Sequence, residues 1–331
     1  MRWTSRRSEQ GFTVVLVAMT IVVMATSAAF AIDLGQGYTS RRQMQNAADA
    51  ASLAGTRTLL KVRNTVTGAF LDPTGSVWTT VRDTAVQNGA DSSQVTCTII
   101  RRDGSTVAPC SPAAGWILDG LLGGPAGVTV TTAATFQTSF ARIIGRQTLT
   151  SRTSASARIQ PLISSKGAPF IICGNLLKGG YDILSLTGTI KPTSIGMTVA
   201  LQSSQEPNCG AGSTFKGKTA DDGTGFALGG WLAGSTGNGN DHSTYDTVAG
   251  ATPCVPPTFT SCDLVLPIAD DGLAGPSMHV VALGVFHVTG NGLGNPKYFG
   301  TLLSASAPVT RGEGGSGNCS PGAACLIKLV S

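Results

Sequence analysis

An uncharged apolar run near the start of the chain, Phe12–Ile32, constrains what the rest of the sequence can do. It has 21 residues and no proline. Because a helix rises about 1.5 Å per residue, a helix of this length spans about 30 Å, the thickness of the hydrocarbon core of a bilayer. Three arginines precede the run and Asp33 follows it. The sequence therefore predicts a membrane-spanning helix that holds the remaining chain on one side of a membrane.

The charges on either side of the run predict its orientation. Residues 1–11 hold three arginines and one glutamate, and the far side carries the pair Arg41 and Arg42. Positive charge favours the cytoplasmic side, so we expect the N-terminus inside and the bulk of the chain outside the cytoplasm. A cleaved secretory signal is the alternative, because Ala28–Ala31 offers small residues. Signal cores of about 7–15 residues are shorter than this run, which favours a retained anchor.

A second kind of processing concerns Gly11 and Phe12. The stretch around them resembles the prepilin-peptidase site of type IV pilins, in which cleavage follows the glycine and the phenylalanine becomes the first residue. Those pilins carry a glutamate at the fifth position after the cut, whereas this chain has Leu16 there. Two alternatives remain, cleavage after Gly11 and a Gly-Phe pair that begins the membrane helix. The missing glutamate favours the second.

The composition of the remaining chain is typical of an exported body. Charged residues make up only 12% of the sequence, and glycine is abundant with 43 residues. The net charge of +5 belongs to residues 1–63, and the charges of residues 64–331 balance. A neutral body lacks the basic face that nucleic-acid binding needs, so we expect no nucleic-acid partner.

Eight cysteines lie downstream of the apolar run and are candidate disulfide partners. They are Cys97, Cys110, Cys173, Cys209, Cys254, Cys262, Cys319 and Cys325. No Cys-x-x-Cys pair marks a zinc site. An even number of cysteines in an exported chain is typical of structural disulfides. Pairing of neighbours along the chain (97 with 110, 173 with 209, 254 with 262, 319 with 325) is the simplest of the many arrangements that eight cysteines allow.

A stalk helix is expected after the membrane helix. Gly35 and Gly37 lie between the two, and each glycine lowers helix stability by about 1 kcal/mol relative to alanine, so we expect a break there. Further on, apolar and small residues recur at near-helical spacing: Met44, Ala47, Ala48, Ala51, Leu53, Ala54 and Leu59. Small residues let another element approach closely. The stalk packs either on a helix of another protein or on its own body, and the sequence leaves both open.

The junction after the apolar run carries a specific pattern. The run ends in AIDLG (31–35), and YTSRR (38–42), QNAADAA (45–51) and LAG (53–55) follow. This pattern resembles the TadE/TadG-like proteins of the tight-adherence (Flp) pilus assembly systems of bacteria. FARIIG (140–145) and ASAR (155–158) extend the resemblance to about residue 160. It implies an envelope protein whose partners are membrane lipid and, through the N-terminal helix, other pilus assembly or pilin-like proteins.

Hydrophobic patterns downstream predict an α+β fold. Val77–Asn88 has helical spacing, whereas Gln94–Arg101, Gly127–Phe136 and Leu149–Ile159 are expected strands. A helix followed by three strands indicates a small module of helix on antiparallel sheet. With a boundary at Pro161–Gly167, the chain divides into a cytoplasmic N-terminus (1–11), a transmembrane helix (12–32), a stalk helix (33–63), a small α+β module (64–160) and a β-rich, disulfide-containing extracytoplasmic domain (161–331).

The last of these parts is expected to consist of short strands and long loops. Strands are predicted at Pro169–Cys173, Asp182–Ile190, Met197–Gln202, Met278–Thr289 and Ala324–Val330. Prolines at positions 256, 257 and 267 are expected to interrupt Val255–Leu266, because proline removes a donor from the sheet ladder.

The histidines do not form the pattern of a metal site. His279 and His287 lie on one expected strand, about 26 Å apart at about 3.3 Å per residue, and His242 lies in an expected loop. We therefore predict no metal, and no catalytic or cofactor-binding residue.

Two other patterns have simpler explanations than a site. Asp221-Asp222 and Asp270-Asp271 each precede a glycine, as turn residues do, and lack the repeated acids of a calcium loop. Gly290–Gly294 follows a strand but opens no helix, which a dinucleotide-binding fingerprint requires.

Location and resemblance together predict a non-enzymatic component of Flp pilus assembly, anchored in the bacterial cytoplasmic membrane. Its role is either that of a scaffold or that of a minor pseudopilin-like subunit. The alternatives are a membrane-anchored secreted enzyme and a ligand-binding protein or adhesin, each with its activity in the C-terminal domain.

Overall fold

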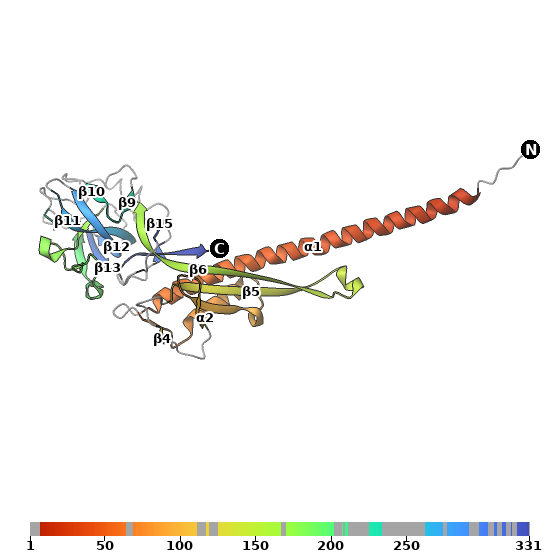
Figure 1. The fold of residues 1–331 in the computed structure, drawn as a ribbon, viewed down its shortest axis with the longest axis horizontal. Coiled ribbons are helices and arrows are strands. Elements are labelled where there is room, and N and C mark those ends of the chain that lie inside the picture. The colour runs from red at the N-terminus through yellow and green to blue at the C-terminus, as the bar shows by residue number, and fades with distance from the viewer. Residues whose placement is uncertain are drawn as a thin grey trace, which may run out of the picture.

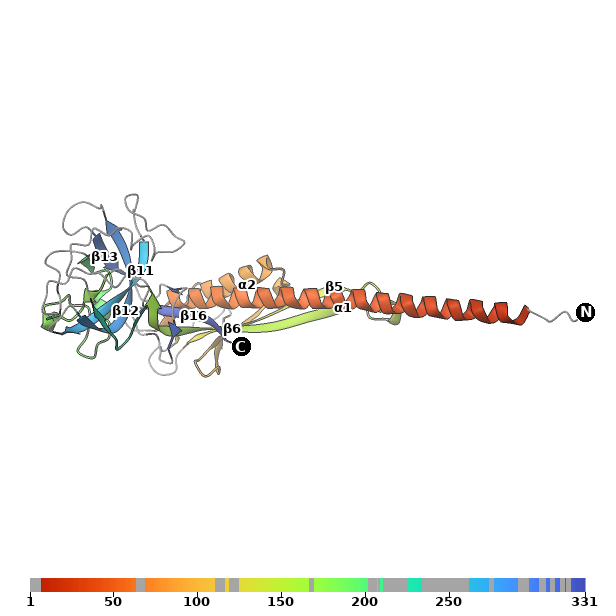
Figure 2. The ribbon, with the colours of Figure 1, turned by 90° about the horizontal axis from the view of Figure 1, so that it is seen from above.

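The computed structural model describes residues 7–63, 69–110, 117–118, 125–166, 170–201, 207, 209–210, 225–233, 262–273, 277–290, 298–303, 308–309, 313–315, 319 and 323–330. The molecule is elongated, and the N-terminal half of its first helix projects far beyond a body of sheets (Figures 1 and 2). The α+β class predicted from the sequence is confirmed.

The first element, α1, is a single helix from Arg7 to Lys61, with 55 residues and a length of about 80 Å. The expected break at Gly35 and Gly37 is therefore wrong. Each glycine costs only about 1 kcal/mol, which is too little to interrupt a helix that continues for several turns on both sides. Membrane segment and stalk are two halves of one element.

The C-terminal half of α1 packs on a sheet that we call the proximal sheet. Its strand order is β14-β16-β6-β5-β2-β3, and β9 and β15 pair with β6 away from this path. The strands are β2 (Thr96–Ile100), β3 (Thr106–Pro109), β5 (Gly127–Gln137), β6 (Thr148–Lys166), β9 (Gly225–Ala227), β14 (Pro308–Val309), β15 (Glu313–Gly314) and β16 (Cys325–Val330). A second helix, α2 (Ser76–Gln87), packs beside α1 (Figure 2).

The small residues of α1 form the contact with this sheet. Ala47, Ala48 and Ala51 are fully buried, and Ala47 and Ala51 belong to the same core as Val128 and Val130 of β5. Polar groups fix the same contact, since Thr132 of β5 donates to the Met44 carbonyl at 2.8 Å. Of the two alternatives for the stalk, packing on the chain's own body is the one that the structure shows for this face.

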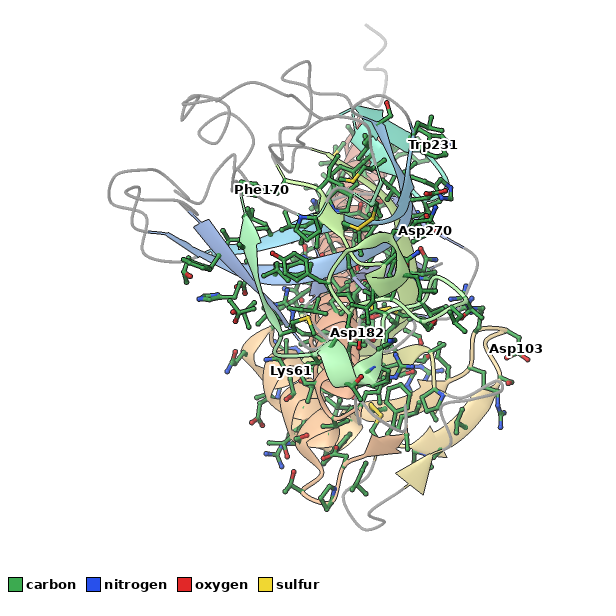
Figure 3. The ribbon with its side chains drawn as sticks, turned by 90° about the vertical axis from the view of Figure 1, so that its left-hand side faces the viewer. Lys61, Asp103, Phe170, Asp182, Trp231 and Asp270 are labelled. Carbon is green, nitrogen blue, oxygen red and sulfur yellow. A yellow bond between two sulfur atoms is a disulfide. The ribbon has the colours of Figure 1, made fainter. Side chains whose placement is uncertain are left out.

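The far end of the body is a second, distal sheet. Its order is β7-β11-β12-β13-β8, with β10 paired to β12. The strands are β7 (Ile172–Cys173), β8 (Thr198–Leu201), β10 (Trp231–Ala233), β11 (Cys262–Gly272), β12 (Ser277–Gly290) and β13 (Tyr298–Leu302). Figure 3 views the molecule from this end, with Trp231 of β10 and Asp270 of β11 labelled at the upper right and Lys61, the last residue of α1, at the lower left.

Short elements complete the described chain. β1 (Phe70–Leu71) pairs with β4 (Ile117–Leu118), and four short 3₁₀ helices are η1 (Ser92–Gln94), η2 (Ala141–Ile144), η3 (Leu176–Lys178) and η4 (Pro192–Ser194). The predicted helix at Val77–Asn88 and the predicted strands at Gly127–Phe136 and Met278–Thr289 correspond to α2, β5 and β12.

β6 connects the two sheets. Its 19 residues continue through Pro161 to Lys166, so the strand runs into the expected boundary at Pro161–Gly167. At the other end of the chain, β16 returns and pairs antiparallel with β6 from Cys325↔Pro161 to Val330↔Ser156. The final strand of the chain thus belongs to the proximal sheet, although the division at residues 160 and 161 places it with the distal domain.

Two strand expectations differ from the structure. Asp182–Ile190 forms a tight turn in place of a strand, in which the Ser185 amide donates to the Thr189 carbonyl at 2.8 Å and Gly188 has a φ of 74°. Conversely, β11 runs through Pro267. Among the described residues β7 pairs with β11 only at Ile268 and Ala269, so Pro267 lies at an edge where its missing N–H is tolerated.

Candidate functional site

The N-terminal half of α1 exposes a long apolar surface. Between Phe12 and Ile32 every side chain is exposed except Ala29, which is 8% exposed. The helix is long and apolar enough to cross a membrane. Soluble proteins rarely leave so large an apolar surface open to water, so this surface is typical of a helix that is covered by lipid or by other helices. Gly11 and Phe12 lie inside this helix, about one turn after its first residue.

Directly after the apolar run, Asp33 holds the tip of the β5–β6 hairpin. Its side chain is buried, with 7% of the residue exposed. One carboxylate oxygen accepts the Ser139 N–H at 2.8 Å, and the other accepts the N–H groups of Phe140 at 3.1 Å and Ala141 at 2.7 Å. These amides lie at the start of η2, where a helical turn has no partners of its own for them. The carboxylate supplies the missing acceptors.

The pKa of the Asp33 carboxyl lies below its ordinary value. Burial raises it, but the N–H groups of Ala141, Ser139 and Phe140 and the charge of Arg142 stabilise the carboxylate and outweigh burial. The ionised form is therefore the one that holds the hairpin against the helix.

A stripe of covered residues shows how far the hairpin extends along α1. Ala29, Asp33 and Met44 are buried, and Gly37 and Ser40 between them are half-buried, all at steps of three or four residues. Such steps place residues on one helix face. The end of the hairpin is the part of the body that reaches furthest along α1 toward the N-terminus (Figure 1). The covered stripe thus enters the apolar run by one helical turn.

The sequence analysis did not predict the contact between Asp33 and the hairpin tip, although it noted both segments that form it. Asp33 is the acid of the AIDLG pattern, and the hairpin tip is the FARIIG block. Nothing in the spacing indicates that residues 106 to 108 positions apart are bonded to each other.

Three of the candidate disulfides lie within the described residues. Cys97 is joined to Cys110, Cys173 to Cys209 and Cys319 to Cys325. These are the pairs that pairing of neighbours along the chain gives. The fourth candidate pair, Cys254 with Cys262, involves side chains outside the described part of the structure.

The two strand histidines are each paired with an aspartate of the neighbouring strand β11. His279 Nδ1 lies 2.9 Å from an Asp270 carboxylate oxygen, and His287 Nδ1 lies 2.7 Å from Asp263. Trp231 packs on the His279 ring at 5.1 Å. The two pairs occupy separate places on β12 and do not combine into one site.

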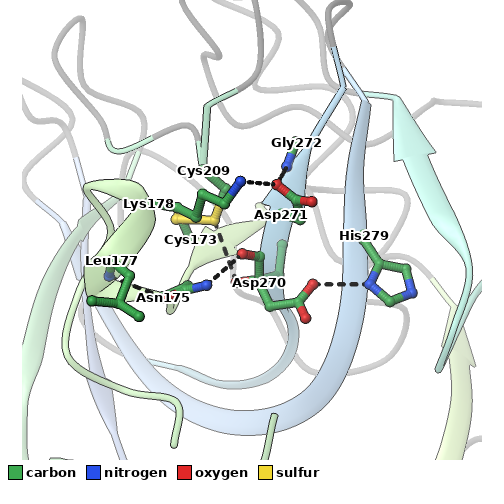
Figure 4. Close-up of a disulfide and its surroundings, with 10 residues drawn as sticks. Cys173, Asn175, Leu177, Lys178, Cys209, Asp270, Asp271, Gly272 and His279 are labelled. Atoms are coloured by element: carbon green, nitrogen blue, oxygen red, sulfur yellow. Dashed lines mark hydrogen bonds and ion pairs between the residues drawn. A yellow bond between two sulfur atoms is a disulfide. The ribbon is translucent and has the colours of Figure 1, made fainter. Parts of the chain in front are cut away.

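Asp271 is held by a lysine. Lys178 lies 3.0 Å from its carboxylate, while the backbone carbonyl of Asp270 accepts the Asn175 side-chain amide at 2.8 Å (Figure 4). The lysine hydrogen bond is the main cause that lowers the pKa of Asp271. Asp270 and Asp271 therefore tie β11 to η3, next to the Cys173–Cys209 disulfide.

The other residues that the sequence analysis considered as sites cannot be placed in the structure. His242, Asp221-Asp222 and residues 291–294 of the glycine-rich stretch lie outside the described residues. Within the described ranges, no three His, Cys, Asp or Glu residues gather as a metal site would require.

Comparison with known proteins finds one similarity, and it covers the N-terminal helix. Residues 11–58 match the family described as Flp pilus-assembly TadE/G-like. No curated protein and no solved structure matches the chain significantly. The matched segment contains the exposed apolar run, Asp33 and the buried alanine face, and it confirms the resemblance drawn from AIDLG and QNAADAA. Residues 11–58 of this chain are thus similar to the TadE/G-like Flp pilus-assembly family.

Proposed function

We propose that the protein is a non-enzymatic, membrane-anchored component of bacterial Flp pilus assembly, with its N-terminus in the cytoplasm and its body outside. The observation that carries this proposal is the division of α1 within the matched segment. Its first half exposes apolar side chains on all sides, and its second half is built into the body. One element thus joins a membrane to a folded extracytoplasmic domain.

The exposed half of the helix is also where partners bind in this proposal. Among the described residues of the apolar run only Ala29 is covered by the body. The remaining faces are open to lipid and to the apolar helices of other pilus proteins. Because lipid tails are as apolar as the side chains, no hydrophobic effect drives such helices together, and they associate through close packing and side-chain hydrogen bonds.

The absence of catalysis is part of the proposal. The pairing of His279 with Asp270 and of His287 with Asp263 supports it, because each histidine already has a stabilising role between β11 and β12. Within the described residues, neither pair belongs to a group of three His, Cys, Asp or Glu residues that could hold a metal ion.

Deletion of the gene in the source bacterium tests the assignment. We expect surface pili and pilus-dependent attachment to be lost and to return when the full-length chain is expressed from a plasmid. Pilus number and attachment that stay unchanged in the deletion strain would contradict the proposal.

Exchange of the membrane helix distinguishes a scaffold from a minor pseudopilin-like subunit. The complementing chain would carry an unrelated membrane helix in place of residues 12–32, with residues 33–331 intact. A scaffold needs only anchorage and retains function, whereas a pilin-like subunit needs its own helix surface and loses it. Mass spectrometry of sheared pili then reports whether the wild-type chain is present in the filament and whether its N-terminus begins at Phe12.

A further inference from the structure

We propose that the tip of the β5–β6 hairpin, residues 139–149, is a second membrane contact that binds the anionic headgroups of phospholipids beside the anchor. The inference rests on the proposed membrane anchorage of α1. It adds a surface of the body to the part of the protein that touches lipid.

The height of the tip follows from its bonds to Asp33. The apolar run ends at Ile32, so the next residue lies where the hydrocarbon core gives way to headgroups. The amides of Ser139 and Ala141 lie 2.8 Å and 2.7 Å from the Asp33 carboxylate. Ala29, about 6 Å deeper along the helix, is covered as well. The hairpin tip is therefore held at the level of the headgroups.

The hairpin is built to reach this level. β2 pairs with β5 only as far as Thr131, and β16 pairs with β6 only from Ser156 onward. Among the described residues, β5 and β6 pair beyond these positions only with each other, down to Gln137↔Thr148. A two-stranded ribbon is marginally stable alone, and here α1 and the Asp33 carboxylate support it. The two-stranded part of β5 and β6 thus extends from the proximal sheet along α1 to the end of the apolar run.

The chemistry of the tip fits a membrane surface. Phe140 is 39% exposed and Leu149 is 42% exposed, and the side chains of Arg142 and Arg146 are exposed between them. Aromatic rings and long basic side chains are the groups that lie at the membrane interface, where the guanidinium meets headgroup phosphate.

The charge around the tip favours anionic lipid. Residues 120–181 contain no aspartate or glutamate. The acid bonded to the tip is Asp33, whose carboxylate is already occupied by three backbone N–H groups. Arg41 and Arg42 of α1 are exposed a few turns further along the helix and add positive charge on the same side of the membrane. Basic residues close to a surface of anionic lipids bind it by charge attraction.

Tryptophan reporters in the full-length chain test the contact. Phe140→Trp and, as a second reporter, Leu149→Trp would be reconstituted in nanodiscs of phosphatidylcholine and phosphatidylglycerol in which lipids are brominated near the headgroup. Leu186→Trp is the control, because Leu186 is 92% exposed on the distal part of the body. We expect brominated lipid to quench the added fluorescence at 140 and 149 but not at 186.

A pair of charge variants tests the role of the arginines. In the Phe140→Trp background, Arg142→Gln with Arg146→Gln removes two charges at the tip, and Lys61→Gln with Lys328→Gln removes two exposed charges away from the tip. We expect the first pair to abolish the excess quenching in phosphatidylglycerol discs over pure phosphatidylcholine discs. The second pair should leave that excess in place.

The outcomes separate this proposal from the proposed anchorage. Failure of the wild-type chain to enter nanodiscs at all would refute the anchor itself. Entry into nanodiscs with equal quenching at 140, 149 and 186 would overturn the hairpin contact and leave the anchor standing. Intact disulfides and an unchanged thermal unfolding midpoint show that the reporters are folded.

Discussion

At the scale of single residues, one carboxylate connects the anchor to the body. Asp33 is buried in the middle of a helix and yet stays ionised, because three amides and Arg142 surround it. An asparagine at this position has the same shape, but one of its oxygens becomes an NH₂ donor facing N–H donors. The junction therefore depends on charge and acceptor number more than on size.

Replacement Asp33→Asn is expected to loosen the hairpin tip and to remove a pH dependence. The folded-state pKa is lowered, so the contribution of Asp33 to stability is fully present above the unfolded value of about 3.9 and is lost as the pH falls through the folded pKa. Thermal unfolding midpoints from pH 6 to pH 2 should fall faster for wild type than for Asp33→Asn.

The difference between the two curves isolates this residue, because Asp91, Asp103 and Asp271 also have lowered pKa values and titrate in both proteins. Parallel curves would show that Asp33 contributes nothing through its charge. Hydrogen exchange at residues 139–141 gives a local readout and should quicken in Asp33→Asn.

Sequence patterns found the residues of this junction but not the bond between them. AIDLG and FARIIG are recognisable as short strings, and each is local. Their contact depends on the register of β5 with β6 and on the length of the hairpin, which side-chain patterns do not encode. The pairs His279–Asp270 and His287–Asp263 were missed for the same reason, since cross-strand neighbours follow from register.

At the scale of elements, the continuity of α1 is the largest departure from expectation. The glycines at 35 and 37 suggested a break, because propensity counts each residue separately. Helix formation is cooperative, however, so a residue of low helix propensity stays helical when the turns on both sides of it are helical. Strongly alternating strands such as β5 and β12 were predicted well. The Asp182–Ile190 turn was not, because three hydroxyls and Gly188 favour local hydrogen bonds over a ladder.

Two glycines of α1 should respond to alanine in opposite directions. A methyl group at Gly35 meets no atom within 4 Å, so Gly35→Ala should stabilise the helix by about 0.5–1 kcal/mol. At Gly55 the same methyl lies 2.4 Å from Val81 Cγ2 of α2, so Gly55→Ala should destabilise by about 1–3 kcal/mol through overpacking.

Urea or thermal unfolding of the full-length protein in detergent measures both variants. A lower stability for Gly35→Ala would indicate that this position bends or meets another part of the chain. A neutral Gly55→Ala would show that α1 and α2 are not packed as tightly as the structure has them.

At the scale of the whole molecule, the two sheets are not formed by two successive segments of the chain. β6 belongs to the proximal sheet and reaches the distal core through Leu162, and Ala324, just before β16, lies in the same core. The expected division at residues 160 and 161 lies within β6, and it assigns β16 and the first part of β6, which pair with each other, to different parts of the chain. A boundary signal such as Pro161 describes local sequence and does not show where the last strand pairs.

Removal of the disulfides should destabilise the protein in the order of the loops that they close. The loops span 6 residues for Cys319–Cys325, 13 for Cys97–Cys110 and 36 for Cys173–Cys209. Loop-closure entropy then predicts losses of about 2, 3 and 4 kcal/mol for paired Cys→Ser variants. Denaturant unfolding of the oxidised full-length chain tests the order. The largest loss from the shortest loop would mean that local packing, and not chain entropy, determines the effect.

The unbroken course of α1 has a mechanical consequence. In the proposed membrane arrangement, α1 is a stiff rod that begins in lipid and ends in a packed core, and it transmits force along its axis without a hinge to absorb it. Any machinery that pulls the apolar end out of the bilayer therefore loads the alanine face and the proximal sheet at once. Extraction then moves the body as one piece with its anchor, and the hairpin beside the rod is the first part to be drawn away from the headgroups.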